Sequence, residues 1–137
     1  MRTRHIEVTR TPQVAIIWLN RPRVSNAING IMVRELEITI RALDKDDSVR
    51  AVVLAGHGSV FCAGFDLLWI KILRKSHLPL KSQAPMGMAR LLQTLDGMQK
   101  PTIARVHGGA YAGGLGLIAV CDIVVASMNA EFCVAEP

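Results

Sequence analysis

Five glycines lie within one stretch of the chain, VHGGAYAGGLGLIAVCD at Val106–Asp122. Glycine has no Cβ and tolerates positive φ, so the backbone N–H groups of such a stretch can come close to a ligand. The stretch begins as the end of an apolar strand and continues into a short apolar run that predicts a helix. A helix N-terminus offers unpaired N–H donors and a partial positive charge, which together bind a developing oxyanion. The alternative interpretation is a tight turn packed against a neighbouring element.

A second glycine loop, GHGSVFCAGFDL at Gly56–Leu67, follows the apolar run Val49–Ala55. Both loops follow a predicted strand and present small residues before a predicted helix. If neighbouring strands carry the two loops, their N–H groups converge on one point. Two such donors stabilise an enolate or a tetrahedral oxyanion by roughly 3–4 kcal/mol each in favourable cases.

Periodicity and turn residues predict the elements that position these loops. A hairpin is expected from Ile6–Thr9 and Val14–Leu19, and a helix over Gly30–Leu43 with Asn29 as its N-cap. The run Val49–Ala55 predicts a fully buried strand, because its apolar residues do not alternate with polar ones.

Further along the chain, the basic segment 74–85 (RKSHLPLKSQAP) is expected to be irregular and mobile. Strands and helices alternate after residue 30, which indicates a layered α/β architecture with βαβ crossovers. No natural domain end is evident at the last residues. The remaining predicted helices are Leu67–Leu73, Met86–Met98 and Gly113–Val120, and the strands are Thr102–Val106, Ile123–Ala126 and Phe132–Val134.

Composition limits the classes of partner. The 137 residues are half hydrophobic, which is enough for one domain with its own core. The net charge of +5 suits an anionic partner, but no basic run with interleaved aromatics supports a nucleic-acid interface. No apolar run approaches the ~18 residues of a membrane helix, so no membrane partner is expected. The three cysteines fit no zinc pattern and predict buried, reduced thiols in a cytoplasmic protein with no metal site.

Five segments together resemble the enoyl-CoA hydratase/isomerase (crotonase) superfamily, in family order and over nearly the whole chain. They are NRPRVSNAI at Asn20–Ile28, FCAGFDL at Phe61–Leu67, KPTIARVHGGAYAGGLGL at Lys100–Leu117, CDIVVAS at Cys121–Ser127 and AEFCVAEP at Ala130–Pro137. The resemblance implies an α/β fold with a crotonase-like ββα spiral core. It also implies a single domain over residues 1–137 that corresponds to the N-terminal part of the family domain, with the C-terminal helical part absent.

The resemblance implies an acyl-CoA thioester as substrate, with coenzyme A as part of the substrate and no separate cofactor. It assigns the two oxyanion N–H donors to Ala63 and Gly113. Arg21 or Arg23 would meet a CoA phosphate, a solvated loop arginine being the alternative for either. The implied substrate-binding residues are Arg23, Val24, Asn26, Ala27, Phe61, Ala63, Phe65, Asp66, Leu67, Tyr111, Gly113, Gly114 and Gly116.

Hydratases of this family often carry two glutamates, and here only one is present. The first position, three residues after the oxyanion glycine, is Gly116. The second, in a motif of F-x-x-x-E type, is Glu136 after Phe132, which makes Glu136 the expected acid/base. A carboxylate in an apolar pocket has a raised pKa, which suits proton transfer near neutrality. The pattern most resembles the methylglutaconyl-CoA hydratase-like branch, so water addition to an enoyl-CoA, within fatty acid metabolism, is the expected lyase reaction.

Three alternatives stay open at this stage. A single glutamate also suits an enoyl-CoA isomerase. The chain is shorter than family members, which would allow an inactive truncated product, and the family implies a homo-oligomer, either a trimer or a dimer of trimers. Finally, Gly114–Ala119 matches the G-x-G-x-x-A dinucleotide fingerprint of an NAD(P)-binding Rossmann module, although six residues separate Val106 from Gly113 where that fingerprint requires a tight turn.

Overall fold

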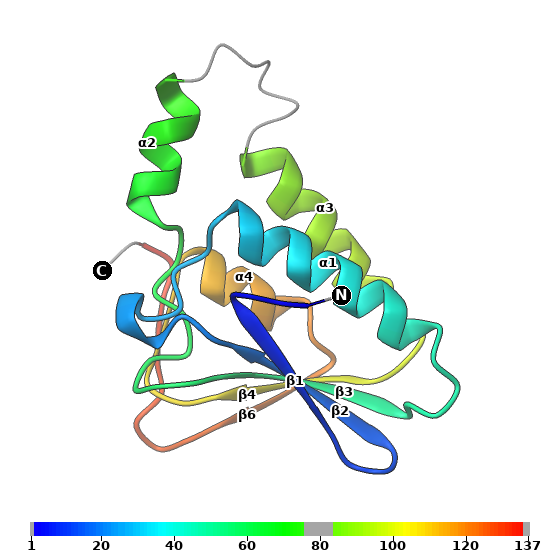
Figure 1. Cartoon of the computed structure of the whole chain (residues 1–137). Helices are drawn as coiled ribbons and strands as arrows, with labels where there is room; N and C mark the ends of the chain where they lie inside the picture. The colour runs from blue at the N-terminus through cyan, green and yellow to red at the C-terminus, as the bar shows by residue number, and fades with distance from the viewer. Residues whose placement is uncertain (1, 76–83, 136–137) are drawn as a thin grey trace.

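The computed structural model describes the backbone of residues 2–75 and 84–135 and the side chains of residues 2–75 and 87–135. A five-stranded sheet in the order β1-β2-β3-β4-β6 forms the base of the molecule (Figure 1). Strands β1 (Ile6–Arg10) and β2 (Val14–Leu19) form the expected antiparallel hairpin. Strands β3 (Ala51–Gly56), β4 (Thr102–Val106) and β6 (Ile123–Ala126) then add in parallel.

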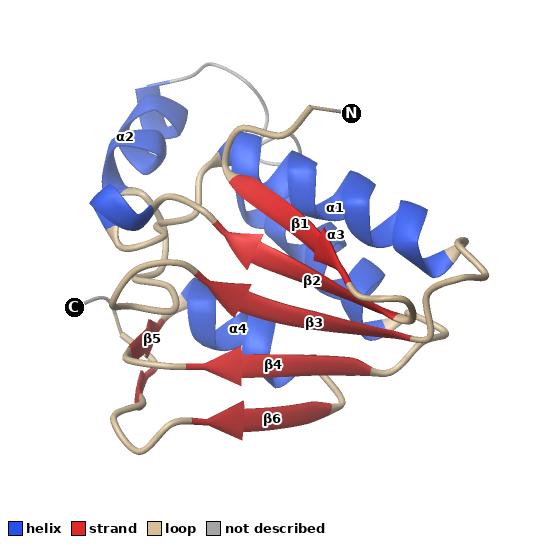
Figure 2. Ribbon diagram, turned by 60° about the horizontal axis from the view of Figure 1, so that its bottom comes forward, coloured by secondary structure: helices blue, strands red, loops and turns tan. Residues whose placement is uncertain are grey.

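Helices lie on one face of this sheet (Figures 1 and 2). Helix α1 (Gly30–Asp44) connects β2 to β3, and Asn29 caps it by accepting a hydrogen bond from the Met32 N–H at 3.0 Å, as predicted. Helix α3 (Ala84–Asp96) packs beside α1 and precedes β4. The short helix α4 (Gly113–Ala119) lies between β4 and β6.

The core lies between the sheet and these helices. Its largest buried side chains include Ile17, Leu36, Phe61, Leu91 and Leu117. Burial alternates along β2 and the first half of β3, because the described helices cover only one face of the sheet. The prediction of a buried strand over Val49–Ala55 was therefore wrong for Ala51 and Val53, which are half-buried, and for Arg50, which is exposed and precedes the strand.

A small second sheet pairs β5 (Gly109–Tyr111) with β7 (Glu131–Cys133) in parallel. The sequence gives little signal for β5, because the strand has only three residues and two of them are glycine and alanine. Strand β7 begins one residue before the predicted Phe132–Val134. Strand β6 was predicted with its observed bounds, but all four of its residues are exposed.

Helix α2 (Leu67–Lys75) projects from the body of the molecule at the top of Figure 1. It has no buried residue, and Leu67, Leu68 and Ile72 are all at least 60% exposed. The irregular segment expected at 74–85 is helical at 74–75 and 84–85, and the remainder lies outside the described residues. Within the described part of the chain, no helix is long and apolar enough to cross a membrane.

Candidate active site

The two glycine loops lie against each other, as the sequence predicted. The Cys62 N–H donates to the Gly109 carbonyl oxygen at 3.1 Å, and the Tyr111 N–H donates back to the Cys62 oxygen at 2.9 Å. These bonds form an isolated parallel bridge between Cys62 and Ala110. Gly114, at the start of α4, packs so tightly on Cys62 that a Cβ would lie 2.7 Å from the cysteine Cβ. The Val106–Asp122 stretch can approach the Gly56–Leu67 loop only because this position is glycine.

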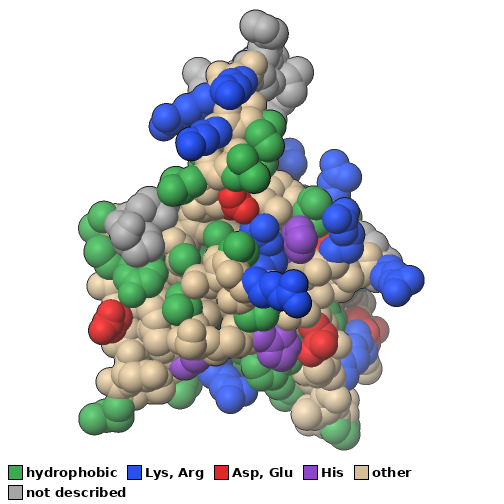
Figure 3. Space-filling view, turned by 60° about the vertical axis from the view of Figure 1, so that its left-hand side comes forward, with side chains coloured by type: hydrophobic (Ala, Val, Ile, Leu, Met, Phe, Trp, Pro, Cys, Tyr) green, Lys and Arg blue, Asp and Glu red, His purple; other side chains and the backbone are tan. Residues whose placement is uncertain are grey.

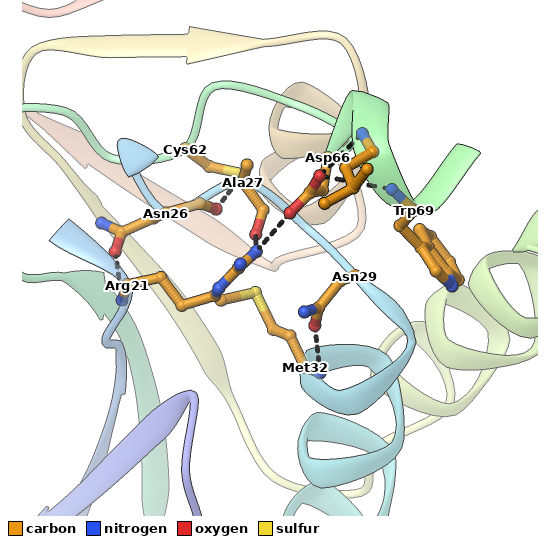
Figure 4. Close-up of polar contacts among 9 residues, drawn as sticks. Arg21, Asn26, Ala27, Asn29, Met32, Cys62, Asp66 and Trp69 are labelled. Atoms are coloured by element: carbon orange, nitrogen blue, oxygen red, sulfur yellow. Dashed lines mark hydrogen bonds and ion pairs between the residues drawn. The ribbon is translucent and has the colours of Figure 1, made fainter. Parts of the chain in front are cut away.

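Asn26 ties the Gly56–Leu67 loop to the Asn20–Ile28 segment (Figure 4). Its Nδ2 group donates to the carbonyl oxygens of His57, Val60 and Phe61 at 2.8, 3.0 and 3.1 Å, and its Oδ1 accepts from the Arg21 N–H at 2.8 Å. The side chain is completely buried. Asn26 was predicted to bind substrate, but this burial and hydrogen bonding give it a structural role beneath the site.

Arg21 and Asp66 form a second tie between the same segments (Figure 4). The Arg21 guanidinium donates to the Ala27 carbonyl oxygen at 2.6 Å and to Asp66 Oδ2 at 3.1 Å. The other oxygen of Asp66 accepts from the backbone N–H groups of Leu68 and Trp69, and so caps helix α2. Burial acts to raise the pKa of Asp66, but the Arg21 hydrogen bond and charge and these two amides outweigh it and hold the pKa below its ordinary value. Arg21 is thus engaged within the protein.

A cavity of about 290 Å³ opens between the two tied segments. Six of the predicted substrate-binding residues line it together with Leu68: Val24, Ala27, Ala63, Phe65, Asp66 and Leu67. The lining is mostly apolar, with backbone groups and one carboxylate as its polar components. The structure therefore brings together the NRPRVSNAI and FCAGFDL motifs at one concave surface.

Other predicted residues do not reach this cavity. Phe61 and Gly114 are buried in the packing beneath it. Arg23 is exposed, and its side chain makes no hydrogen bond or ion pair with another described residue. Tyr111 is half-buried on β5, with its hydroxyl 3.4 Å from a carboxylate oxygen of Glu131.

The two predicted oxyanion donors differ in their surroundings. Gly113 is the first residue of α4, and no hydrogen bond joins its N–H to another residue in the described part of the chain. The preceding residue, Ala112, has φ 46° and ψ −112°, a strained conformation held by a hydrogen bond from its N–H to the Cys133 oxygen at 2.9 Å. The Ala63 N–H, in contrast, donates to the Ser25 carbonyl oxygen at 2.9 Å. That donor is already used.

The sequence gives no indication of how the Phe65 backbone is oriented. Ile28 pairs in parallel with Phe65 through bonds to Gly64 and Asp66, so the Phe65 N–H points away from Ile28. The Phe65 ring lies 3.2 Å from the position of a Cβ on Gly113, so the two residues are neighbours. The direction of the Phe65 N–H follows from the pairing of Phe65 with Ile28, which joins residues 37 positions apart and is not evident from local sequence.

The family's two carboxylate positions correspond to Gly116 and Glu136 in this chain. A Cβ on Gly116 would meet only the Leu92 side chain, at 3.7 Å, so this half-buried position has room for a side chain. Glu136, the predicted acid/base, lies outside the described residues. No group of three or more potential metal ligands occurs among the residues described.

Comparison with known proteins identifies the family. The family model for enoyl-CoA hydratase/isomerase matches residues 9–137. The chain belongs to the enoyl-CoA hydratase/isomerase family. This confirms the family resemblance and the fold class.

Relatives within this family have different reactions in their names. A 4-chlorobenzoyl coenzyme A dehalogenase of Arthrobacter is 38% identical over 93% of this chain and 47% of its own length. A crotonyl-CoA hydratase of Syntrophomonas wolfei is 29% identical over 96% of the chain and 50% of its own length. A solved enoyl-CoA hydratase structure from Shewanella pealeana superposes with a TM-score of 0.90 at 30% identity, covering 96% of this chain and 49% of that one. The chain spans about half the length of these family members.

Proposed function

We propose that this family member binds an acyl-CoA thioester in the cavity between the NRPRVSNAI and FCAGFDL segments. The observation that carries the proposal is the hydrogen-bonded junction of the two glycine loops, with Gly113 beside the Phe65 ring that lines the cavity. Apolar walls with a few convergent polar groups suit a thioester and its pantetheine arm. Arg23, exposed and next in sequence to the lining residue Val24, is available to a CoA phosphate.

Chemistry at this site begins with polarisation of the thioester carbonyl. The Gly113 N–H supplies one donor, at the positive end of the α4 N-terminus. Either of two amides can supply the second. Ala63 would have to exchange the Ser25 oxygen for the thioester oxygen, and the other candidate is the Phe65 amide, which faces away from Ile28. Two donors lower the barrier to an enolate, which hydration and isomerisation share.

The proposed reaction is water addition to an enoyl-CoA, with Glu136 moving the proton. The hydratases among the relatives support this choice. With Gly116 in place of a first carboxylate, Glu136 would act alone, so isomerisation is the second candidate. Aromatic dehalogenation, named for another relative, belongs to the same class of thioester chemistry. An NAD(P) site has less support, since β5 and its flanking residues separate β4 from α4 where that fingerprint requires a tight turn.

The test measures binding and turnover separately. Calorimetric titration should show binding of CoA and of crotonyl-CoA, and none of NADH. Loss of the enoyl-thioester absorbance with water uptake supports hydration, whereas double-bond migration without water uptake supports isomerisation. Replacement Gly113→Pro removes one donor and should slow turnover by about 10²–10³-fold with little change in CoA affinity. Glu136→Gln should abolish turnover and keep CoA binding.

The control for these variants is Arg50→Gln, an exposed change directly before β3, at the end of the strand far from the glycine loop. NADH binding without CoA binding would overturn the proposal. Binding of CoA with no turnover of any enoyl-CoA would overturn the proposed reaction and leave only the proposed acyl-CoA binding. Size measurement by light scattering would establish whether the chain forms the trimer that the family implies.

A further inference from the structure

A second, larger cavity of about 620 Å³ lies between the start of α1 and the projecting helix α2. Its volume falls within the range of small-molecule sites. It shares Asp66 and Leu68 with the 290 Å³ cavity, but its other lining residues come from α1 and its N-cap, from α2, from the segment before β1 and from Arg21 after β2. Apart from Arg21, which pairs with Asp66, none of these other residues belongs to the proposed acyl-CoA site.

Three arginines and two carboxylates line this cavity, and both carboxylates are hydrogen-bonded within the protein. Glu35 accepts hydrogen bonds from the backbone N–H groups of Arg4 and His5 at 2.6 and 2.7 Å, which occupies both of its oxygens. Asp66 is held by Arg21 and by the α2 amides. Both lining carboxylates are therefore already satisfied within the protein.

Two lining arginines remain without a counter-ion. The guanidinium groups of Arg4 and Arg34 make no hydrogen bond or ion pair within the described ranges 2–75 and 84–135. Burial, and after it the charge of Arg21, lowers the pKa of nearby His5, in keeping with a positive local field. Figure 3 shows the same excess of Lys and Arg side chains on α2 and on the surface beneath it.

The opposite wall of the cavity is apolar. Trp69, Leu68 and Ile72 face it from α2, and Ile31 faces it from α1. The Trp69 indole packs over Gly30, where a Cβ would lie 3.1 Å from its Nε1 atom. The cavity thus joins two unpaired arginines to an aromatic and aliphatic wall.

We propose that this cavity is a binding site for a small amphipathic anion, with its headgroup at Arg4 and Arg34 and its apolar body against Trp69, Leu68 and Ile72. Arginine recognises carboxylate and phosphate alike through paired N–H donors. The headgroup end is separate from the acyl-CoA site, because Arg4 and Arg34 line only the larger cavity, whereas Leu68 lines both.

The test uses the full chain carrying Trp18→Phe, which leaves Trp69 as its only tryptophan. Decanoate, decyl phosphate and decanol are titrated against Trp69 fluorescence at low salt. We expect saturable binding of at least one anion, about fivefold or more tighter than that of decanol, and weakened by added salt. The two anions then show which headgroup the arginines prefer.

The decisive variant is Arg4→Gln with Arg34→Gln, which should bind the anions no better than decanol. Lys45→Gln with Arg50→Gln removes two exposed charges elsewhere and should leave the preference intact. If the double variant fails to fold, Arg34→Gln alone, at an exposed helix position, gives the same comparison. Three results overturn the proposal: no anion preference in the parent, equal loss in the control pair, or competitive displacement of the anion by CoA. The last would mean that the probe occupies the acyl-CoA site.

Discussion

Gly114 packs against Cys62 so closely that a Cβ on the glycine would lie 2.7 Å from the cysteine Cβ and 2.9 Å from its carbonyl oxygen. Two residues later in the same helix, Gly116 faces only Leu92 at 3.7 Å. The two glycines differ in what surrounds them, and this difference gives a matched pair of substitutions.

Gly114→Ala should destabilise the protein by several kcal/mol, since a buried backbone contact must move apart. Gly116→Ala should instead stabilise it by about 0.5–1 kcal/mol, because alanine has the better helix propensity and the position has room. Urea unfolding of both variants measures the difference. Equal effects would mean that the loop junction is not packed as described.

Gly116→Glu, which places a carboxylate at the family's first carboxylate position, should likewise fold and shift activity towards simple enoyl-CoAs.

Replacement of Asn26 tests the tie beneath the site. Asn26→Ala leaves three carbonyl oxygens and one N–H without their partner, so a loss of about 3 kcal/mol in unfolding free energy is expected. Asn26→Asp should cost at least as much at neutral pH, because it turns a buried carboxylate towards those oxygens. Asn20→Ala, in the same segment but half-buried, is the control. A change in CoA affinity without any loss of stability would return Asn26 to the role of a ligand contact.

The Arg21–Asp66 pair predicts acid sensitivity. The folded pKa of Asp66 is lower than that of the unfolded chain, so its stabilising contribution is present above the ordinary pKa of 3.8 and is lost as pH falls through the folded value. Asp66→Asn should reduce stability at neutral pH and flatten the decline in acid. The pKa of Asp46 is also depressed, by Ser48 and Arg10, so Asp46→Asn measures the overlapping contribution. The assignment of this acid sensitivity to Asp66 would be contradicted if stability fell with pH equally steeply in the wild type and in Asp66→Asn below pH 3.8.

The three thiols should differ in reactivity. Cys133 is exposed, Cys62 is buried, and burial raises the pKa of Cys121 to about 11. One thiol should therefore react rapidly with a disulfide reagent at about pH 8, and Cys133→Ser should remove that phase. Rapid reaction of a second thiol would show that the sheet edge opens. The sequence had predicted three buried thiols, which was wrong for Cys133, since β7 is exposed.

Much of the scaffold was predictable from local pattern. Asn29 with the apolar spacing of α1 located that helix, and the bounds of β4 and β6 were predicted as observed. Side-chain roles were less accessible, because they depend on register and on neighbours distant in the chain. Nothing local distinguishes Asn26 as a buried tie from Asn26 as a ligand contact. Likewise, the Ser25 oxygen that takes up the Ala63 amide is 38 positions away in sequence.

The Asn26 tie also bears on the order in which the chain folds. Its amide joins residues 31 to 35 positions apart, and the Cys62–Ala110 bridge joins segments still more distant. The β1–β2 hairpin, in contrast, closes through a short turn. Because non-local contacts must overcome the entropy of loop closure, we expect amide protection in pulse-labelled refolding to appear first in the hairpin and later at Cys62 and Tyr111. The two glycine loops would then acquire their geometry only after most of the sheet has assembled.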